Sequence, residues 1–207
     1  MGPGYVRVRA AAGNPNGNMG AMSADEPTGP SPTLPQVIRE VEEFASTAGW
    51  DQPPQLFALV STADLLARQP DLGGQLDPGS PLTPIAQEPL SDGDLAEALA
   101  GIAWPGTVTG CALVQEIVVL PPDAEAELQV ESPSELDPID TERMRRIAAE
   151  HPKRREARLV AAVLRDGTAA CVLRLRGDAE HPDEIVEHPE LAPNLVDALR
   201  ETLRDED

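Results

Sequence analysis

Aromatic residues are scarce in this sequence of 207 residues, of which they make up 2%. The hydrophobic core must therefore consist of Leu, Val, Ile and Ala, and a core of that kind is possible because 41% of the residues are hydrophobic. Few aromatic rings also leave few surfaces on which nucleic-acid bases can stack. The aromatic residues are Tyr5, Phe44, Trp50, Phe57 and Trp104.

Positive charge is also scarce. The chain has 16 basic residues, of which lysine supplies only Lys153, against 36 acidic residues, and its net charge is −20. An electric field of this sign repels nucleic acid and anionic membranes. We therefore expect no nucleic-acid partner and no membrane partner. The preference for Arg over Lys, together with many Ala and Pro residues, is typical of a GC-rich genome.

Long apolar runs are absent, and cysteines are few. No stretch of about 18 apolar residues is present, and the N-terminus has no apolar signal core, so we expect a cytoplasmic protein. Cys111 and Cys171 are the two cysteines, and a reducing compartment favours free thiols at both. Both lie in strand patterns, which favours inert core thiols over a catalytic cysteine.

The chain is expected to form a disordered tail over residues 1–30 and a single domain over 31–207. The tail contains Gly, Pro, Asn and Ala without apolar periodicity, so it cannot bury enough surface to offset its ordering entropy. Within it, Met19 or Met22 is an alternative start. The first helix is predicted between a capping Thr33 and a terminating Gly49, because an apolar stripe with helical spacing lies between them.

A hairpin gives the clearest strand signal, with strands over 156–164 and 168–176 around Asp166-Gly167, a pair typical of a type I′ turn. In its second strand, apolar residues alternate with Arg174 and Arg176, which predicts one buried face and one face in water. The order of elements indicates an α+β fold, with an antiparallel sheet of about four strands and helices packed on it. The other expected elements are strands over 55–60 and 108–120, helices over 61–68, 91–102, about 140–150 and 194–203, and loops over 69–90 and 121–142.

Several stretches resemble an actinobacterial family of uncharacterised proteins. The resemblance covers most of residues 33–204 and implies a bacterial cytoplasmic protein. It brings no activity and no catalytic residues. The stretches that carry it are Trp50-Asp51-Gln52-Pro53-Pro54-Gln55-Leu56-Phe57-Ala58-Leu59-Val60, Gln87-Glu88-Pro89-Leu90, Ile102-Ala103-Trp104-Pro105, Gly110-Cys111-Ala112-Leu113-Val114 and Val163-Leu164-Arg165-Asp166-Gly167, with Cys171-Val172-Leu173-Arg174-Leu175-Arg176.

Motifs for catalysis and for cofactor or metal binding are weak. The three histidines, His151, His181 and His188, each lie in a Glu-His-Pro tripeptide, where proline favours an extended turn over a metal site. The sequence contains no nucleophile elbow, P-loop, dinucleotide-binding glycine motif or Cys-x-x-Cys pair. We therefore predict no catalytic residue, cofactor or metal. Three acidic residues are assigned to helix caps instead of catalysis: Asp64, Asp92 and Asp94.

One segment is basic against the acidic background. Seven of the 16 basic residues lie between Arg143 and Arg158, and the guanidinium fork of arginine suits phosphate and carboxylate groups. We hypothesise that arginines of this segment and of the hairpin bind an acidic protein partner or a small anion. The alternative is internal neutralisation by the acidic run over 123–142. The candidate residues are Arg143, Arg146, Arg154, Arg155, Arg174 and Arg176.

Three functions remain open. The first is a non-catalytic binding or regulatory protein that uses these arginines. The second is a hydrolase or transferase whose site assembles from distant residues such as His151, Asp64 and Arg143. The third is a homo-oligomeric structural protein, such as a homodimer within a larger assembly, formed by the strand over 108–120 if that strand lies at a sheet edge. An enzyme should present a pocket with converging polar groups, and a binding protein a flat or grooved patch.

Overall fold

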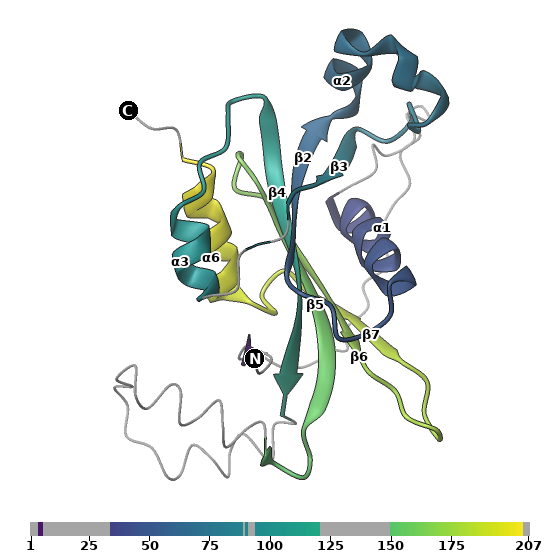
Figure 1. The fold of residues 1–207 in the computed structure, drawn as a ribbon, viewed down its shortest axis with the longest axis vertical. Helices are drawn as coiled ribbons and strands as arrows, with labels where there is room; N and C mark the ends of the chain where they lie inside the picture. The colour runs from purple at the N-terminus through teal and green to yellow at the C-terminus, as the bar shows by residue number, and fades with distance from the viewer. Residues whose placement is uncertain (1–3, 6–33, 89, 91–93, 121–149, 205–207) are drawn as a thin grey trace, which may run out of the picture.

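The computed structural model of this protein describes residues 4–5, 34–88, 90, 94–120 and 150–204. Figure 1 shows an α+β arrangement of these residues, the fold class that the sequence predicted. Its helical elements are α1 (Leu34–Thr47), α2 (Thr62–Arg68), the 3₁₀ helix η1 (Pro70–Gly74), α3 (Leu95–Ala100) and α6 (Pro193–Thr202). Its strands are β1 (Gly4–Tyr5), β2 (Gln55–Ser61), β3 (Leu82–Ala86), β4 (Val108–Val119), β5 (Arg155–Leu164), β6 (Ala169–Leu175) and β7 (Glu184–Glu187).

Six strands form an antiparallel sheet in the order β3-β2-β4-β5-β6-β7. The prediction of about four strands was therefore too low, because both edge strands were missed. β3 lies in the segment predicted as a loop and contains Pro84, a residue that a strand tolerates only at an edge or at its start. β7 has only four residues, two of them acidic, so its alternation is too short to recognise.

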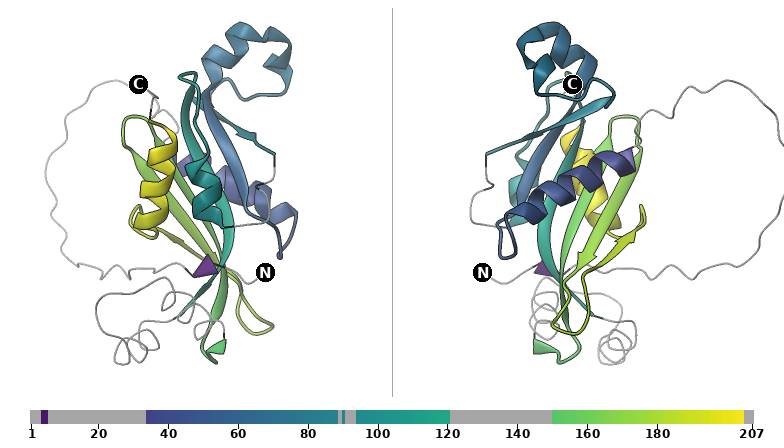
Figure 2. Two further views of the ribbon diagram at one scale, coloured as in Figure 1. Left: turned by 60° about the vertical axis from the view of Figure 1, so that its left-hand side comes forward. Right: turned by 90° about the vertical axis from the view of Figure 1, so that its right-hand side faces the viewer.

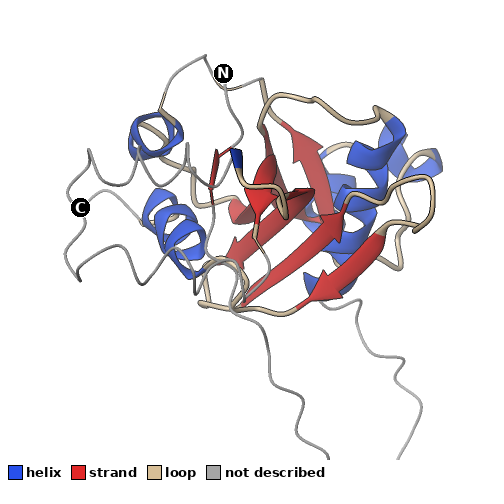
Figure 3. Cartoon of the chain, turned by 90° about the horizontal axis from the view of Figure 1, so that it is seen from below, coloured by secondary structure: helices blue, strands red, loops and turns tan. Residues whose placement is uncertain are grey.

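Helices cover both faces of the sheet, as Figure 3 shows from below and Figure 2 from two sides. On one face, α1 lies across the strands, and on the other face α3 and α6 lie side by side. Each face has its own apolar core. Val37, Ile38 and Val41 pack on the α1 face, and Leu195 and Leu199 pack on the α6 face. The central strands are thus buried on both sides, as β4 was predicted to be.

The local signals for the helices are confirmed where the structure describes them. Gly49 follows α1 with φ of 82°, the left-handed conformation that ends many helices. The Ser61 hydroxyl accepts a hydrogen bond from the Asp64 amide at the start of α2. The Asp94 carboxylate caps α3 by accepting from the Ala96 amide at 2.7 Å. The other predicted caps, Thr33 and Asp92, lie outside the described residues, as do residues 140–149 of the helix predicted over 140–150.

The hairpin is confirmed, but its turn differs from the prediction. Leu164 N donates to Thr168 O at 2.9 Å, and Gly167 N donates to Leu164 O at 2.9 Å, so the loop has three residues. Asp166 does not have the positive φ that a type I′ turn requires, whereas Gly167 has φ of 88°. This is a type I turn followed by a glycine bulge, a geometry that the Asp-Gly pair also suits.

Two further differences concern the edges of β4. This strand lies between β2 and β5, so it cannot pair with a second copy as the oligomer hypothesis required. β2 pairs with β4 only as far as Val114, and Gly4–Tyr5 pairs with the remaining free edge at Ile117 and Val118. These two residues belong to the tail predicted as disordered over 1–30, and the rest of that tail lies outside the described residues. Among the described helices, none has the length and apolarity needed to cross a bilayer.

Candidate functional site

The polar centre of the molecule is an ion pair between the helix α1 and the sheet. Glu42 occupies a position within the apolar stripe of α1 and is only 1% exposed. Arg174 on β6 donates two parallel hydrogen bonds to the Glu42 carboxylate, from Nε at 2.6 Å and from Nη2 at 2.5 Å. The Ser46 hydroxyl donates a third, at 2.8 Å. A buried carboxylate needs such partners, because an unpaired charge in the protein interior is strongly unfavourable.

Arg158 on β5 extends this pair into a network. Its side chain is 2% exposed and lies 3.6 Å from the Glu42 carboxylate and 3.2 Å from that of Glu116. It also donates to the Ser46 hydroxyl at 2.9 Å and to the Gly49 carbonyl at the end of α1. We call Glu42, Glu116, Arg158 and Arg174 the buried ion network. It attaches the C-terminal half of α1 to the three neighbouring strands β4, β5 and β6.

The same network holds the loop after α1. Asp51 has φ of 67°, and this left-handed conformation allows the Asp51 and Gln52 amides to donate to the Glu116 carboxylate at 2.8 and 3.3 Å. The guanidinium of Arg158 lies 4.6 Å from the centre of the Trp50 ring, and that of Arg176 lies 5.2 Å from it. Both distances are within the range of cation–π attraction. The Trp50-Asp51-Gln52-Pro53-Pro54 motif is therefore a loop fixed on the sheet by charged residues.

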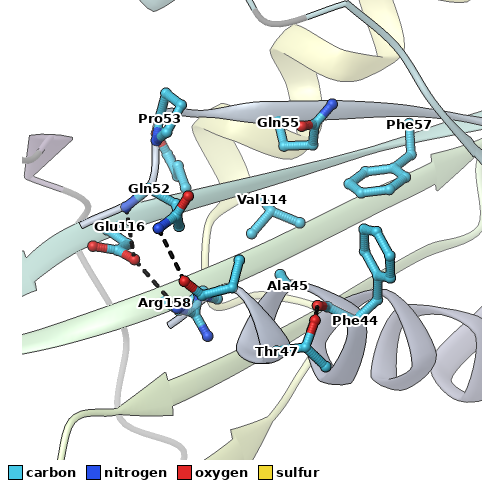
Figure 4. A pocket seen from close by; sticks show the side chains of 12 residues that line it. Phe44, Ala45, Thr47, Gln52, Pro53, Gln55, Phe57, Val114, Glu116 and Arg158 are labelled. Atoms are coloured by element: carbon cyan, nitrogen blue, oxygen red, sulfur yellow. Dashed lines mark hydrogen bonds and ion pairs between the residues drawn. The ribbon is translucent and has the colours of Figure 1, made fainter. Parts of the chain in front are cut away.

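Beside this loop lies an open hollow with a volume of about 130 Å³ (Figure 4). Phe44 and Phe57 meet edge to face in its wall, with ring centres 6.2 Å apart, and Val114 and Pro53 add apolar surface. Phe44 is 62% exposed, the largest exposure among the large apolar side chains in the described part of the chain. We call this feature the α1 hollow; it is lined by Phe44, Ala45, Thr47, Ala48, Gln52, Pro53, Gln55, Phe57, Val114, Gln115, Glu116 and Arg158.

The charged residues that line the α1 hollow, and Glu42 of the adjoining buried ion network, are already paired within the protein. Burial tends to raise the pKa of Glu42, but hydrogen bonds from Arg174 and Ser46 and the nearby guanidiniums outweigh burial and hold this pKa below its usual value. Glu42 is therefore a stable carboxylate. The Glu116 carboxylate accepts from two backbone amides and from Arg158. Both carboxylates are thus held by partners within the protein.

The predicted arginine site is not brought together in the part of the chain that the structure describes. Arg174 is held by Glu42 under α1, so the wet face predicted for the hairpin is wrong at Arg174, whereas Arg176 is exposed. Arg176 pairs with Glu156, and Arg155 lies 3.3 Å from Glu184. These arginines are therefore paired within the protein, with acids outside the run 123–142, and that run lies outside the described residues, so its role stays a prediction.

The other candidate arginines have different outcomes. Arg154 is exposed, and the structure gives it no ion pair among the described residues. Arg143 and Arg146 lie outside the described residues, so their place in an anion site stays a prediction.

The histidines of the Glu-His-Pro tripeptides support turns, as predicted. Nδ1 of His151 accepts from the Lys153 amide at 3.1 Å, and Nδ1 of His188 accepts from the Glu190 amide at 3.2 Å. His181 contacts Asp178 at the turn between β6 and β7. Within the described ranges, no three histidine, cysteine or acidic side chains come together in a way that would hold a metal ion.

The cysteines are confirmed as buried free thiols. Burial raises the pKa of Cys111 to about 11 and that of Cys171 to about 11. Cys111 is on β4 and Cys171 on β6, with β5 between them. Two strand spacings amount to roughly 9–10 Å, and a disulfide requires Cα atoms closer than about 7 Å. The two thiols therefore cannot join.

The residues suggested for an enzyme site do not meet. Asp64 follows the end of β2 that pairs with Val108, the first residue of β4. His151 precedes the end of β5 that pairs with Val119, the last residue of β4. These ends of the 12-residue strand are ~36 Å apart at the usual rise per residue. Arg143, the third residue of that set, lies outside the described residues.

Fold and site together define a class: an α+β protein with a six-stranded antiparallel sheet between helices and a buried ion network under one helix. The chain belongs to the PPA1309-like protein family, which it matches over residues 34–204. The resemblance to an uncharacterised family is thereby confirmed. No curated protein and no solved structure matches the chain.

Sequence reasoning missed the residues that build this site. Glu42, Glu116 and Arg158 were not singled out as functional candidates, and Arg174 was assigned to a face in water. One signal was present: Glu42 follows Val41 and lies four positions after Ile38, inside the apolar stripe of the first helix. A glutamate at a core position of a helix requires a buried cation nearby.

Proposed function

We propose that this protein is a non-catalytic binding protein and that the α1 hollow is its binding site. The observation that carries the proposal is the exposure of Phe44, 62%, at the rim of an apolar concave surface. An exposed aromatic residue beside a pocket is a typical anchor point at protein interfaces. The buried ion network supports the same function, because it fixes the walls of the hollow before any partner arrives.

The proposal is tested with small analogues of side chains. p-Cresol and isobutanol resemble the side chains of Tyr and Leu, and their binding can be mapped by amide chemical shifts of the full chain. We expect shifts around Phe44, Gln52 and Val114 that disappear in Phe44→Ser. Ile185→Ser is the matched control, because Ile185 is 50% exposed on β7 and lies outside the hollow. Shifts that cluster elsewhere, or that persist in Phe44→Ser, would contradict the proposal.

A second candidate is the anion or acidic-partner site on the arginine segment. The observation in its favour is that Arg154 is exposed and has no acidic partner among the described residues. Internal pairing of Arg155, Arg174 and Arg176 leaves fewer guanidiniums for such a site, so it ranks below the α1 hollow.

We further infer a cytoplasmic location and an actinobacterial source. Two free thiols suit a reducing compartment. The excess of arginine over lysine suits a GC-rich genome.

A further inference from the structure

The rim of the α1 hollow carries exposed charge of one sign. Glu40 lies one helical turn before Phe44, and Glu43 lies one turn before Thr47, so each acid neighbours a residue that lines the hollow. Both acids are exposed, and so is Asp51, whose amide is bonded to Glu116 at the other side of the hollow. These carboxylates and the partly exposed Glu116 give the opening of the hollow a negative potential.

The positive groups near the hollow do not offset this potential at the surface. Arg158 is the one base among the lining residues, and it is 2% exposed and bound to Glu42 and Glu116. Arg39, one turn before Glu43, is paired with Glu187 on β7. The surface that a partner meets is therefore an apolar centre with acids around it.

We propose that the α1 hollow binds a polypeptide segment in which an apolar side chain is flanked by arginine or lysine. The apolar side chain fills the space between Phe44, Phe57 and Val114, and the flanking cations face Glu40, Glu43 and Asp51. This inference rests on the proposed function and adds the chemistry of the partner.

Charge complementarity selects this occupant over two others. A second copy of this chain would bring the same net charge of −20 to the interface, and like charges oppose association. Nucleic acid would meet the acidic rim with its phosphates, which is also repulsive. A segment with basic flanks meets the opposite charge of Glu40, Glu43 and Asp51, and its rate of association rises for the same reason.

The geometry favours a single anchoring side chain. The Phe44 ring is supported by its edge-to-face contact with Phe57, and the loop of Gln52 and Pro53 is held by Glu116. A preformed site loses little entropy on binding, so a short segment suffices.

The test is selection from a phage-displayed library of random seven-residue peptides on the immobilised full-length protein. We expect the enriched peptides to contain an apolar residue next to Arg or Lys. Individual clones are then measured on Phe44→Ser, on Glu40→Gln/Glu43→Gln and on the control Ile185→Ser. Binding should fall at least tenfold in Phe44→Ser, and severalfold in the double variant, with a weaker salt dependence. Ile185→Ser should bind as the wild type does.

The outcomes separate the two proposals. Peptides that require Phe44 but carry no basic residues, or that bind Glu40→Gln/Glu43→Gln unchanged, would overturn the basic-partner inference and leave the binding site in place. Enriched peptides that bind Phe44→Ser as well as the wild type, or the failure of any peptide to be enriched, would overturn both. Circular dichroism of each variant confirms that its fold is intact, which is expected because all four substituted residues are exposed.

Discussion

Arg174 and Glu42 meet through two parallel hydrogen bonds, of 2.6 and 2.5 Å, that join β6 to the buried side of α1. Glu42 lies between two guanidiniums, because Arg158 is 3.6 Å from the same carboxylate. An acid in this place fixes the position of α1 on the sheet, since any shift of the helix would leave a buried charge without its partner.

Replacement of Glu42 by Gln should therefore destabilise the protein strongly. Removal of one member of a buried ion pair typically lowers the free energy of unfolding by about 3–5 kcal/mol. Urea denaturation followed by circular dichroism measures the change. Glu156→Gln is the matched control, because it removes an acid from the exposed pair with Arg176, and such pairs contribute about 0–1 kcal/mol. Equal effects of the two substitutions would contradict the role assigned to Glu42.

The same carboxylate should make stability depend on pH in the acid range. Because the pKa of folded Glu42 lies below its usual value near 4.5, its stabilisation is present above that value. As pH falls through the lower pKa of the folded state, this stabilisation is lost. Below pH 4.5, the urea concentration at the midpoint of unfolding should therefore decrease with falling pH more steeply in the wild type than in Glu42→Gln. Parallel pH profiles would show that Glu42 carries no such linkage.

Gly167 should be required for the hairpin. Its φ of 88° is a conformation that a β-branched residue adopts only with strain, so Gly167→Val should lower the free energy of unfolding by about 1–3 kcal/mol. No atom lies within 4 Å of a Cβ built at this position, so the effect comes from the backbone alone. Gly106→Val is the control, because Gly106 is equally open and lacks a positive φ. Thermal denaturation of both variants makes the comparison.

Both thiols should resist modification in the folded protein. Cys111 and Cys171 are buried, and a pKa of about 11 leaves almost no thiolate at neutral pH. Ellman's reagent should release less than one equivalent of product from the native protein and two equivalents from protein unfolded in guanidinium. Fast reaction of either cysteine in the native state would show that its strand opens locally.

The arginine segment can be tested independently of the α1 hollow. Replacement of Arg143, Arg146, Arg154 and Arg155 by Gln should change the free energy of unfolding by about 1 kcal/mol or less if their contacts are exposed. The second candidate function requires that the wild type binds inorganic phosphate or a polyglutamate peptide, with affinity that falls as salt is added. It also requires that the fourfold variant does not bind. Equal heats of titration for the two proteins would refute it.

The elements that sequence reasoning predicted correctly are those whose signals are local. The stripe of α1 and the caps at Ser61 and Asp94 each lie within a few residues of the chain. β3 and β7 were missed because an edge strand needs only one partner and tolerates Pro84 or a short acidic sequence. The turn at Gly167 was assigned to the wrong type. The register of the two strands decides between a type I′ turn and a type I turn with a glycine bulge, and the Asp-Gly dipeptide does not determine that register.

The site was harder to predict because its residues come from distant parts of the chain. Glu42 meets Arg174 across 132 positions, and Arg158 meets Glu116 across 42 positions. The alternation of Arg174 with apolar residues correctly separated the two faces of β6. This alternation could not indicate that a helix covers Arg174, because the covering depends on where α1 packs on the sheet.

Each face of the sheet carries one of the two tryptophans. Trp50 lies against Arg158 and Arg176 on the face that α1 covers, and Trp104 donates from its indole nitrogen to Thr202 at the end of α6. Fluorescence of Trp50→Phe and Trp104→Phe would therefore report on one face each. If the Trp50 signal changes at a lower urea concentration than the Trp104 signal, α1 leaves the sheet while the opposite layer is still folded. Coincident transitions would show that the strands transmit unfolding from one core to the other as a single cooperative event.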